Sequence, residues 1–293
     1  MTFIWQLENF PNFSFSTEKL LPNIQNFALQ LGEANGMLSS FSQENKQEVF
    51  TEIMLSEALK TSEIEGEYFS REDVMSSLKV NLGVKDFHKT SKNKKANAIA
   101  LLMIEIQNSY AKTMDKALIQ NWHKILMDEE KGINAGIFRT GAEPMQVVSG
   151  SYGNLKVHYE APPSKDLPQL INQFLNWYQT FSEKDLGKVG EAMLFSALVH
   201  LYFETLHPFE DGNGRIGRAL AEKALAEKLE MPIFISLSKA IEKDKAKYYQ
   251  ELKKAQRSLK ITDWVVYFFN ILQSALDDTK NLVVFTLKKT NFF

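Results

Sequence analysis

The sequence predicts an all-α protein that carries one β-hairpin. Glycine and proline are sparse, at 14 and 8 of 293 residues, and they cluster in a few places, so long segments run between them without interruption. Within those segments, apolar residues recur at steps of three and four, which is the spacing of an amphipathic helix. No strict alternation of apolar and polar residues runs long enough to indicate a large sheet. The expected fold is therefore a helical core with one small hairpin.

Helical spacing is clearest in four segments, which we expect to be helices. The first lies within residues 20–38 and the second covers residues 50–59. The third covers residues 170–178 and the fourth residues 193–202. The apolar positions that carry the spacing are Leu21, Ile24, Phe27, Ala28 and Leu31, then Phe50, Ile53, Met54, Ala58 and Leu59, then Leu170, Phe174, Leu175 and Tyr178, and finally Met193, Leu194, Ala197, Leu198, Leu201 and Tyr202.

A polar, lysine-rich stretch at residues 81–95 follows the N-terminal helices and marks the expected domain boundary. A short basic run of this kind is either a nucleic-acid patch or a solvated linker, and the linker is far more common. The net charge of −2 gives no global argument for nucleic acid or an anionic membrane as a partner. We therefore divide the chain into an α-helical N-terminal region at residues 1–90 and a larger helical domain at residues 91–293.

One region breaks the helical pattern and predicts the hairpin. Two β-prone runs, at residues 145–148 and 155–159, flank the turn-rich residues 149–154. Such runs on either side of a glycine- and serine-rich turn are typical of a β-hairpin. We expect Ser164 or Asp166 to cap the helix that follows.

The composition is that of a globular protein without disulfides. Hydrophobic residues make up 44% and charged residues 24% of the chain, and there are no cysteines. Disulfides, zinc-thiolate sites and thiol nucleophiles are therefore excluded. The N-terminus shows neither the basic start nor the long apolar core of a signal peptide. The most apolar stretch, residues 264–272, is much shorter than the ~20 residues that a membrane span needs. We expect a soluble, cytoplasmic protein.

Residues 207–218 read HPFEDGNGRIGR and contain an expected anion cradle. Three small or turn-forming residues follow an acidic residue and precede a helical stretch: Gly212, Asn213 and Gly214. Glycines let backbone N–H groups approach an anion closely, and the helix N-terminus adds a favourable dipole. Arg215 and Arg218 lie on one face of that helix and can reach phosphate oxygens.

The same segment supplies a metal ligand and a base. Asp211 offers a hard oxygen of the kind that Mg²⁺ uses beside nucleotide phosphates. His207 titrates near neutrality, so it can take a proton from an attacking hydroxyl. Each fragment alone favours a bland interpretation, since a lone histidine is usually structural and a lone DG or NG dipeptide usually marks a turn. Together and in this order, the residues outline a site for phosphoryl or nucleotidyl transfer.

This segment resembles the signature of the Fic family, HPFxDGNGRxxR, and every specified position matches. Looser similarity to the family extends across most of the chain. The resemblance implies the Fic fold, a helical core with a β-hairpin flap that holds the target, and a reaction that uses ATP and Mg²⁺. Residues 3–13 further resemble the N-terminal region of many bacterial Fic proteins. Such relatives often carry a winged-helix module after the core, which is either missing from this protein or cut from this chain.

The resemblance also implies a role for each signature residue. His207 would be the general base that deprotonates a Ser, Thr or Tyr hydroxyl of the target. Asp211 would hold Mg²⁺ between the α- and β-phosphates of ATP. The backbone amides of residues 212–214 and the Asn213 side chain would form the anion hole, and both arginines would meet the outer phosphates. Phe209 is expected to anchor the loop in the core.

Upstream, residues 61–67 read TSEIEGE and resemble the inhibitory motif of the family, (S/T)xxxE(G/N), with Thr61, Glu65 and Gly66 at the matching positions. Alone, these residues would be an acidic helix end with a glycine C-cap. Their place, N-terminal to the core and after an amphipathic helix, favours the inhibitory interpretation. In that interpretation Glu65 pairs with Arg218, occupies the arginine that the γ-phosphate needs, and leaves the α-phosphate misplaced for in-line attack.

The resemblance implies two further sets of contacts. On the expected flap, family members align the target backbone as an added strand, here at Val147, Val148 and Ser149. Residues 248–252 resemble the adenine-contact stretch, with Tyr249 and Leu252 against the base and Gln256 near the sugar. A tyrosine and a leucine at this spacing are also common in a core, so both interpretations stay open.

The remaining histidines show no pattern that indicates a site. His200 lies seven residues before His207, which is not the HExxH spacing of a metal pair, so we expect a structural role in the core. His88, His123 and His158 have no companions that point to a ligand.

The sequence therefore predicts a protein adenylyltransferase that moves AMP from ATP to a protein hydroxyl and is autoinhibited by Glu65. The family also implies self-modification and homodimers. Two alternatives stay open: removal of AMP, or transfer of another phosphate-containing group, by the same fold, and a non-catalytic interaction module with a vestigial site. The intact His207, Asp211 and arginine pair argue against a vestigial site.

Overall fold

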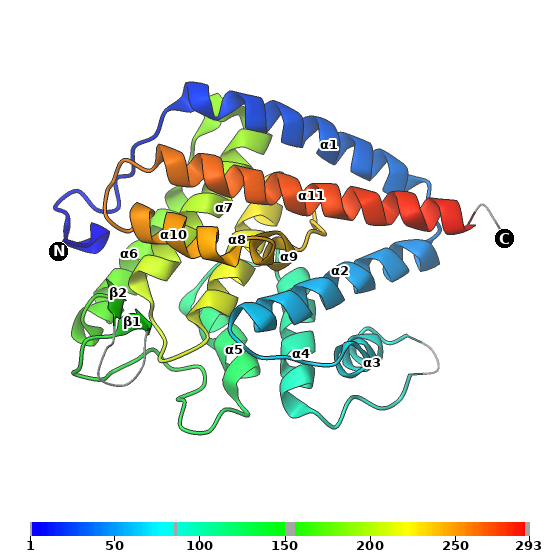
Figure 1. Ribbon diagram of the computed structural model, residues 1–293, viewed down its shortest axis with the longest axis horizontal. Coiled ribbons are helices and arrows are strands. Elements are labelled where there is room, and N and C mark those ends of the chain that lie inside the picture. The colour runs from blue at the N-terminus through cyan, green and yellow to red at the C-terminus, as the bar shows by residue number, and fades with distance from the viewer. Residues whose placement is uncertain (1, 85–86, 150–155, 291–293) are drawn as a thin grey trace.

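The computed structural model describes residues 2–84, 87–149 and 156–290. Across these residues the protein is mainly α-helical with one small antiparallel sheet (Figure 1), which confirms the predicted fold class. The elements are α1 (Leu21–Ser39), α2 (Gln43–Ile64), α3 (Arg71–Asn81), α4 (Lys94–Asn108), α5 (Lys116–Met127), β1 (Gln146–Ser149), β2 (Lys156–Glu160), α6 (Leu167–Thr180), α7 (Gly187–Leu206), α8 (Asn213–Leu229), α9 (Leu237–Glu242), α10 (Lys245–Ala255) and α11 (Thr262–Thr290). Four single-turn 3₁₀ helices are η1 (Ile4–Gln6), η2 (Thr17–Lys19), η3 (Ser164–Asp166) and η4 (Lys184–Leu186).

Every helix predicted from apolar spacing is present. The predicted segments fall in α1, α2, α6 and α7, and the stretch after the signature forms α8. Apolar spacing identifies these helices because each buries one side against its neighbours. The division of the chain at residue 90 stays a prediction.

Polar side chains determine where several helices begin. At six N-caps of the described chain the side chain accepts a hydrogen bond from the backbone N–H three residues later: Ser42, Ser70, Asn93, Asp115, Ser236 and Asp244. Asp166 is the N-cap residue of α6, one of the two residues predicted, but its backbone is already helical as the chain leaves η3 and its side chain makes no capping hydrogen bond. Ser164 Oγ instead accepts a hydrogen bond from Arg139 Nη1 at 2.8 Å.

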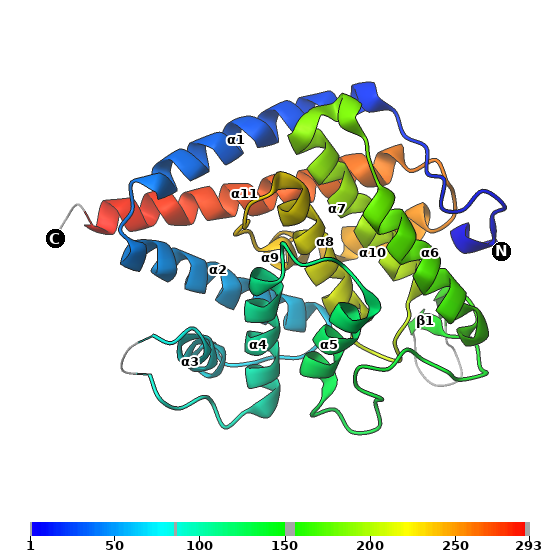
Figure 2. The ribbon, with the colours of Figure 1, turned by 180° about the vertical axis from the view of Figure 1, so that it is seen from behind.

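Helices α7 and α8 form the centre of the molecule. From Ala192 to Leu206 every residue of α7 is buried, and α8 is buried along most of its length. A helix with apolar residues all round belongs in a core. Helices α1 and α11 run side by side, and α7 passes behind α11 in Figure 1 and in front of it in Figure 2. The loop that joins α7 to α8, residues 207–212, therefore lies on a rigid support.

Helix α2 brings the N-terminal region to the same centre. It packs against α9 and α8, and its C-terminal end lies beside the start of α8 (Figure 1). The buried carboxylate of Glu57 accepts hydrogen bonds from Ser236 Oγ at 3.0 Å and from the backbone N–H of Ser238 at 2.8 Å. These bonds fix α2 against the N-terminus of α9.

The predicted hairpin is present as β1 and β2. Val147 pairs with Tyr159 and Val148 with Val157, so His158 is the extra residue of a β-bulge. Apart from Ser149, the predicted turn lies outside the described residues. A bulge increases the local twist and redirects one side chain, and His158 lines the pocket described below.

Two contacts hold the hairpin against the body of the protein. The buried Tyr159 hydroxyl donates to the carbonyl of Thr205 in α7 at 2.6 Å. From the other side, the Phe3 ring meets the Tyr159 ring edge-on, and Trp5 Nε1 donates to the carbonyl of Glu160 at 2.9 Å. The N-terminal segment therefore supports the base of the hairpin, as the neighbouring positions of η1 and β2 in Figure 1 illustrate.

Helix α11 is 29 residues long, and its second half carries Asp277, Asp278, Lys280, Lys288 and Lys289. Within the described part of the chain, we find no helix with both the length and the apolar character to cross a membrane.

Candidate active site

The candidate site begins where α7 ends at His207. Its backbone is left-handed, with φ 45° and ψ 58°, a conformation that costs a non-glycine residue roughly 1–2 kcal/mol. The Arg139 guanidinium stabilises this turn. Its Nε donates to the carbonyl of His207 at 2.8 Å, and Nη2 donates to the carbonyls of Pro162 at 2.6 Å and Leu206 at 3.3 Å. One buried arginine therefore joins the end of α7 to the segment that follows β2.

Phe209 and Asn213 close the loop on itself. The backbone N–H of Phe209 donates to Asn213 Oδ1, and Asn213 Nδ2 donates to the carbonyl of Phe209, both at 2.9 Å. The Phe209 ring is fully buried, as the sequence predicts. The amide of Asn213 is therefore engaged in shaping the loop, and the backbone N–H groups are what remains for an anion.

His123 of α5 supports the loop, a role that the sequence did not indicate. Its ring stacks on Phe209 with centroids 3.7 Å apart. Nδ1 accepts from the backbone N–H of Gly136 at 2.8 Å, so Nε2 carries the proton and lies 3.1 Å from the carbonyl of Asp211. Burial lowers the pKa of His123 to about 4, which keeps this tautomer neutral. The sequence feature that could have indicated this role is the position of His123 next to Trp122 on the buried side of α5.

The N-terminus of α8 provides the anion cradle. Gly212 is its N-cap with φ 76°, and the first amide of α8 to bond back is that of Ile216, to the carbonyl of Gly212 at 3.0 Å. The amides of residues 213–215 therefore have no acceptor within the helix. A β-carbon at Gly212 would lie 3.2 Å from Met127 Sδ, and one at Gly214 would overlap the Glu65 carboxylate. Both glycines are needed for the close approach of other groups.

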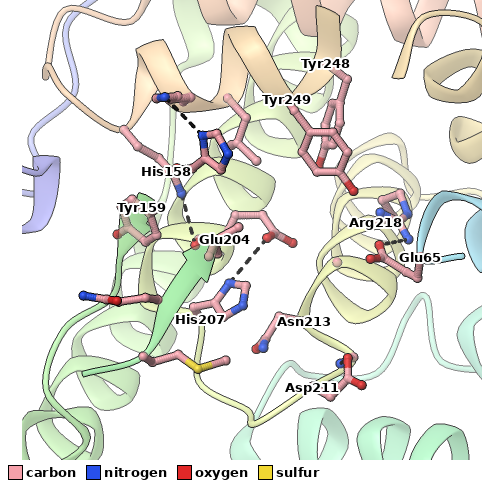
Figure 3. Close-up of a pocket in the computed structure, with 18 of the residues that line it drawn as sticks. Glu65, His158, Tyr159, Glu204, His207, Asp211, Asn213, Arg218, Tyr248 and Tyr249 are labelled. Carbon is pink, nitrogen blue, oxygen red and sulfur yellow. Dashed lines mark hydrogen bonds and ion pairs between the residues drawn. The ribbon is translucent and has the colours of Figure 1, made fainter. Parts of the chain in front are cut away.

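A pocket of about 780 Å³ opens over this cradle (Figure 3). Such a volume suits a small-molecule ligand. Residues predicted for the site that line it are Glu65, Val147, His207, Asp211, Gly212, Asn213, Gly214, Arg218, Tyr249, Leu252 and Gln256. Of the other residues predicted for the site, Thr61, Gly66 and Arg215 are not among its lining, and the side chains of Val148 and Ser149 lie outside the described part of the chain.

His207 lies in the pocket wall with its imidazole mostly buried. Its Nδ1 has no hydrogen-bond partner among the described residues and lies 3.8 Å from Glu204 Oε2. Burial lowers the pKa of His207 to about 4, and the Arg139 guanidinium adds to the effect, while Glu65, the backbone of Glu204 and Asp211 oppose it. The ring is therefore neutral near pH 7 and has a nitrogen lone pair available for a proton.

Glu65 and Arg218 form an ion pair across the pocket (Figure 3), in the arrangement that the resemblance implies. Arg218 Nη2 donates to Glu65 Oε1 at 2.8 Å and to the carbonyl of Thr61 at 3.0 Å, and Nε donates to Thr61 Oγ1 at 2.9 Å. Burial alone would raise the pKa of Glu65, but Arg218 outweighs it and holds that pKa below its usual value. Thr61 and Glu65 of the TSEIEGE segment thus engage the same arginine, and Gly66 follows at φ 84°.

Arg215 points away from the pocket toward Glu67. Its Nη1 donates to Glu67 Oε2 at 2.5 Å, and its side chain is only 5% exposed. Glu67 also pairs with Lys95 at 3.0 Å. In this arrangement Arg215 contacts a carboxylate that follows the inhibitory motif, which the sequence analysis did not single out.

The two tyrosines of the expected adenine stretch have different environments. Tyr248 is fully buried in the wall of the pocket, and its hydroxyl lies 2.8 Å from His200 Nε2 in the core. Tyr249 is 41% exposed and lines the pocket. Leu252 is buried but also lines the pocket, and Gln256 Nε2 donates to the carbonyl of Glu204 at 3.2 Å.

Asp211 is the carboxylate available for a cation. Its side chain is 60% exposed at the pocket, with Oδ1 3.8 Å from Arg215 Nη2. In the described parts of the chain, histidine and carboxylate side chains do not gather in a cluster of three or more that could hold a metal. Mg²⁺ at nucleotide sites takes one or two carboxylates and completes its shell with phosphates and water, so a single exposed aspartate beside a phosphate cradle fits such an ion.

Comparison with known proteins identifies two regions. The model of the Fic/DOC family matches residues 113–225, which include the hairpin and the whole signature. A second model, described as a domain of unknown function (DUF4172), matches residues 3–84 and therefore includes Glu65.

Several curated relatives are named as protein adenylyltransferases. The chain is 39% identical over 69 residues to the probable protein adenylyltransferase aq_aa38 of Aquifex aeolicus (strain VF5), which covers 24% of this chain and 20% of that protein. It is 28% identical over 147 residues to the protein adenylyltransferase Fic of Nematostella vectensis, which covers 49% of this chain and 32% of that protein. The matches thus span about a fifth to a third of the length of these relatives.

Solved structures share the fold over nearly the whole chain. A Fic family protein from Desulfovibrio desulfuricans G20 superposes with a TM-score of 0.68 at 19% identity, over 92% of this chain and 75% of that one. A Fic domain containing signaling protein from Bacteroides thetaiotaomicron VPI-5482 gives a TM-score of 0.66 at 17% identity, over 90% of this chain and 97% of that one. The matching family model and the intact signature identify residues 113–225 as a Fic/DOC domain, in a chain with the fold of Fic family proteins.

Proposed function

We propose that this protein transfers AMP from ATP to a Ser, Thr or Tyr hydroxyl of a target protein, and that Glu65 inhibits the transfer. The observation that carries this proposal is the pocket itself. A neutral histidine, the amide-rich start of α8 and an exposed aspartate line one cavity, and Glu65 holds the arginine at its far side. The relatives named as protein adenylyltransferases support the same reaction.

His207 acts as the general base in this reaction. A ring nitrogen takes the proton of the target hydroxyl, whose oxygen forms a bond to the α-phosphorus while the bond from that phosphorus to pyrophosphate breaks. The amides at the start of α8 hold phosphate oxygens, where the helix dipole favours negative charge. Asp211 would hold Mg²⁺, which would neutralise charge on the phosphates. Tyr249 and Leu252 would pack against the adenine, with Gln256 near the sugar.

The hairpin supplies the surface for the target. An extended segment would pair with the backbone of Val147, Val148 and Ser149 as an added strand. That edge lies at the pocket mouth, because Val147 lines the pocket. The side chains that reach the pocket beside it are His158 and Lys253, whose Nδ1 and Nζ lie 3.2 Å apart.

Inhibition follows from the Glu65–Arg218 ion pair. Arg218 is fully buried and already makes bonds to Thr61 and Glu65, so it cannot also bind the γ-phosphate in the same geometry. ATP would then sit with its α-phosphate displaced, and a displacement of about 1 Å is enough to lower the rate of an in-line reaction about 100-fold.

The partners we propose are hydroxyl-bearing proteins, including the protein itself, and a second copy in a homodimer. We propose the cytoplasm as the location, because ATP is available there and a chain without cysteine needs no oxidising compartment.

The test uses ATP labelled at the α-phosphate, with Mg²⁺. The parent protein, Glu65→Gly and Glu65→Gly/His207→Ala are incubated, and label on the protein is counted. We expect strong labelling of Glu65→Gly alone, at least 100-fold above the double variant, since a general base contributes about 10²–10⁴ in rate. Label at equal levels in all three folded proteins would contradict both the base and the inhibitor. No label in any folded variant would point to AMP removal, another donor or a binding role.

A further inference from the structure

Two unpaired polar groups face each other in the pocket wall. Glu204 lies one helical turn before His207 at the end of α7. Within the described residues, Glu204 Oε1 and His207 Nδ1 are buried and lack a hydrogen-bond partner, and Glu204 Oε2 lies 3.8 Å from that Nδ1. Figure 3 shows the two side chains pointing toward each other. Buried polar atoms normally have partners, so this pair needs an explanation.

The neighbouring helix leaves space for this carboxyl. A β-carbon at Gly217 of α8 would overlap Glu204 Oε1. Gly217 has no strained backbone that would require glycine, because it lies within a regular helix. A glycine inside a helix costs about 1 kcal/mol relative to alanine. At this position it leaves room for the Glu204 carboxyl and the edge of the His200 ring.

The charges around Glu204 make it a titrating group near neutral pH. Burial raises its pKa to about 8, with Arg218 opposing and Glu65 adding to the rise. Tyr248 and Tyr249 of α10 also face the Glu204 carboxyl. The charged groups Arg139 and Asp211 act on the pKa of His207. Because the pKa of Glu204 is about 8 and that of His207 is about 4, the Glu204 carboxyl is protonated at pH 7 and the His207 imidazole is neutral.

We propose that Glu204 is a positioning residue for His207, whose carboxyl group accepts a hydrogen bond from Nδ1–H and stabilises the imidazolium that forms during transfer. This inference rests on the proposed function. With Nδ1–H directed to Glu204, the lone pair of Nε2 faces the target hydroxyl. The hydroxyl proton moves to Nε2 as the oxygen bonds to the α-phosphorus and pyrophosphate leaves. The ring then carries both protons until one passes to solvent. In the form populated above about pH 8, the Glu204 carboxylate is ionised and offsets the positive charge of the ring.

A direct test follows the ring of His207 by NMR without ATP. The chain has five histidines, so labelling histidine with ¹⁵N and ¹³C gives five sets of ring signals, and His207→Asn assigns the relevant one. In the parent we expect the His207 ring to respond to a titration step near pH 8, and Glu204→Gln to remove that step. The exposed His88 provides an internal control. Identical His207 curves in both proteins between pH 6 and 9 would overturn the proposal.

A second test measures transfer in the Glu65→Gly background. Glu204→Gln should lower kcat about 10- to 100-fold, the usual effect of losing a group that orients a functional histidine, with KM for ATP unchanged. It should also flatten a rise in kcat through about pH 8. Glu204→Ala should regain activity with added formate, which a merely structural role would not allow. An unchanged kcat and pH profile in Glu204→Gln would refute the positioning role.

The two tests separate the possible failures. If no variant transfers AMP, the proposed function fails, but the NMR titration still decides whether Glu204 and His207 share a proton. If transfer occurs and the NMR step persists in Glu204→Gln, the pairing is wrong while the proposed function stands.

Discussion

At the scale of single residues, Arg139 does the most to define the geometry of the site. It is 5% exposed, and its guanidinium bonds to carbonyls of Leu206, His207 and Pro162. The carbonyls at the end of α7 carry the negative end of the helix dipole, which favours a cation there. The same planar group fixes the left-handed turn at His207 and the start of the segment after the hairpin.

Replacing this guanidinium with an ammonium group should therefore destabilise the protein. Arg139→Lys keeps the charge but cannot reproduce the planar fork, and carbonyls left unpaired in a buried site cost about 1–3 kcal/mol. We expect the free energy of unfolding, measured in urea, to fall by about 2–3 kcal/mol. Ser164→Ala, which loses a single bond to Arg139, should cost about 1 kcal/mol or less. Equal urea midpoints for Arg139→Lys and the parent would contradict this role.

At the scale of elements, the end of α2 engages both arginines of the signature. Glu65 pairs with Arg218, and Glu67 pairs with Arg215. Glu57, two turns earlier on the same helix, binds the start of α9. The C-cap of α2 and the turn that follows it thus place two carboxylates against the two cations at the start of α8.

The second of these carboxylates should weaken nucleotide binding if Arg215 meets the outer phosphates. Glu67→Gln, made in the Glu65→Gly background, removes the negative charge but keeps the size of the side chain. We expect ATP to bind about tenfold more tightly by calorimetry, which corresponds to about 1.4 kcal/mol. Glu63→Gln, which alters a carboxylate that pairs with Lys60 instead, serves as the matched control. Unchanged affinity in Glu67→Gln would assign Arg215 a structural role.

The sequence predicts best what is local along the chain. The helices follow from apolar spacing, and the signature is contiguous, so its loop and helix N-terminus could be placed before the structure. The contacts of Arg139 with His207 and of His123 with Asp211 join residues 68 and 88 positions apart. No periodicity encodes such pairs, since they depend on how helices pack.

Asn213 and Glu204 illustrate what a sequence pattern alone cannot predict. The Asn213 side chain was expected in the anion hole, but its amide is bound to the backbone of Phe209 on both sides. Glu204 was not singled out, although a carboxylate near the end of an otherwise apolar helix is itself unusual. The pairing of Glu65 with Arg218 was implied by the family motif, and the structure places the two side chains together.

At the scale of the whole molecule, buried titratable groups determine how stability depends on pH. Burial raises the pKa of Glu57, Glu204 and Glu222, and it lowers the pKa of His123, His200 and His207 to about 4. A depressed histidine pKa means that the unfolded chain binds more protons between about pH 4 and 6.5, so stability rises with pH there. A raised glutamate pKa has the opposite effect, because the folded protein then binds more protons and stability falls as the pH rises. Above about pH 6.5 the histidines are neutral in both states, so of these two groups the glutamates alone change the stability.

We therefore expect the free energy of unfolding to fall as the pH rises from about 6.5 to 8. Glu204 alone, with a folded pKa of about 8, should contribute a loss of about 1–2 kcal/mol over that window. Glu204→Gln should flatten the decline when urea midpoints are compared at pH 6.5 and 8.5. Glu18→Gln, at an exposed position, should leave it unchanged. Constant stability of the parent across this window would show that the buried carboxyls are not protonated.

The connection of Glu65 to Arg218 through a single chain has a kinetic consequence. Because both groups belong to one molecule, they meet at an effective concentration in the millimolar range or above, and α2 is held in place further by Glu57 and Thr61. Dilution therefore cannot separate them, and the fraction of molecules with the pair formed is the same at every protein concentration. Release requires a competitor that binds the pocket or a force that displaces α2, and its rate should be first order in the protein.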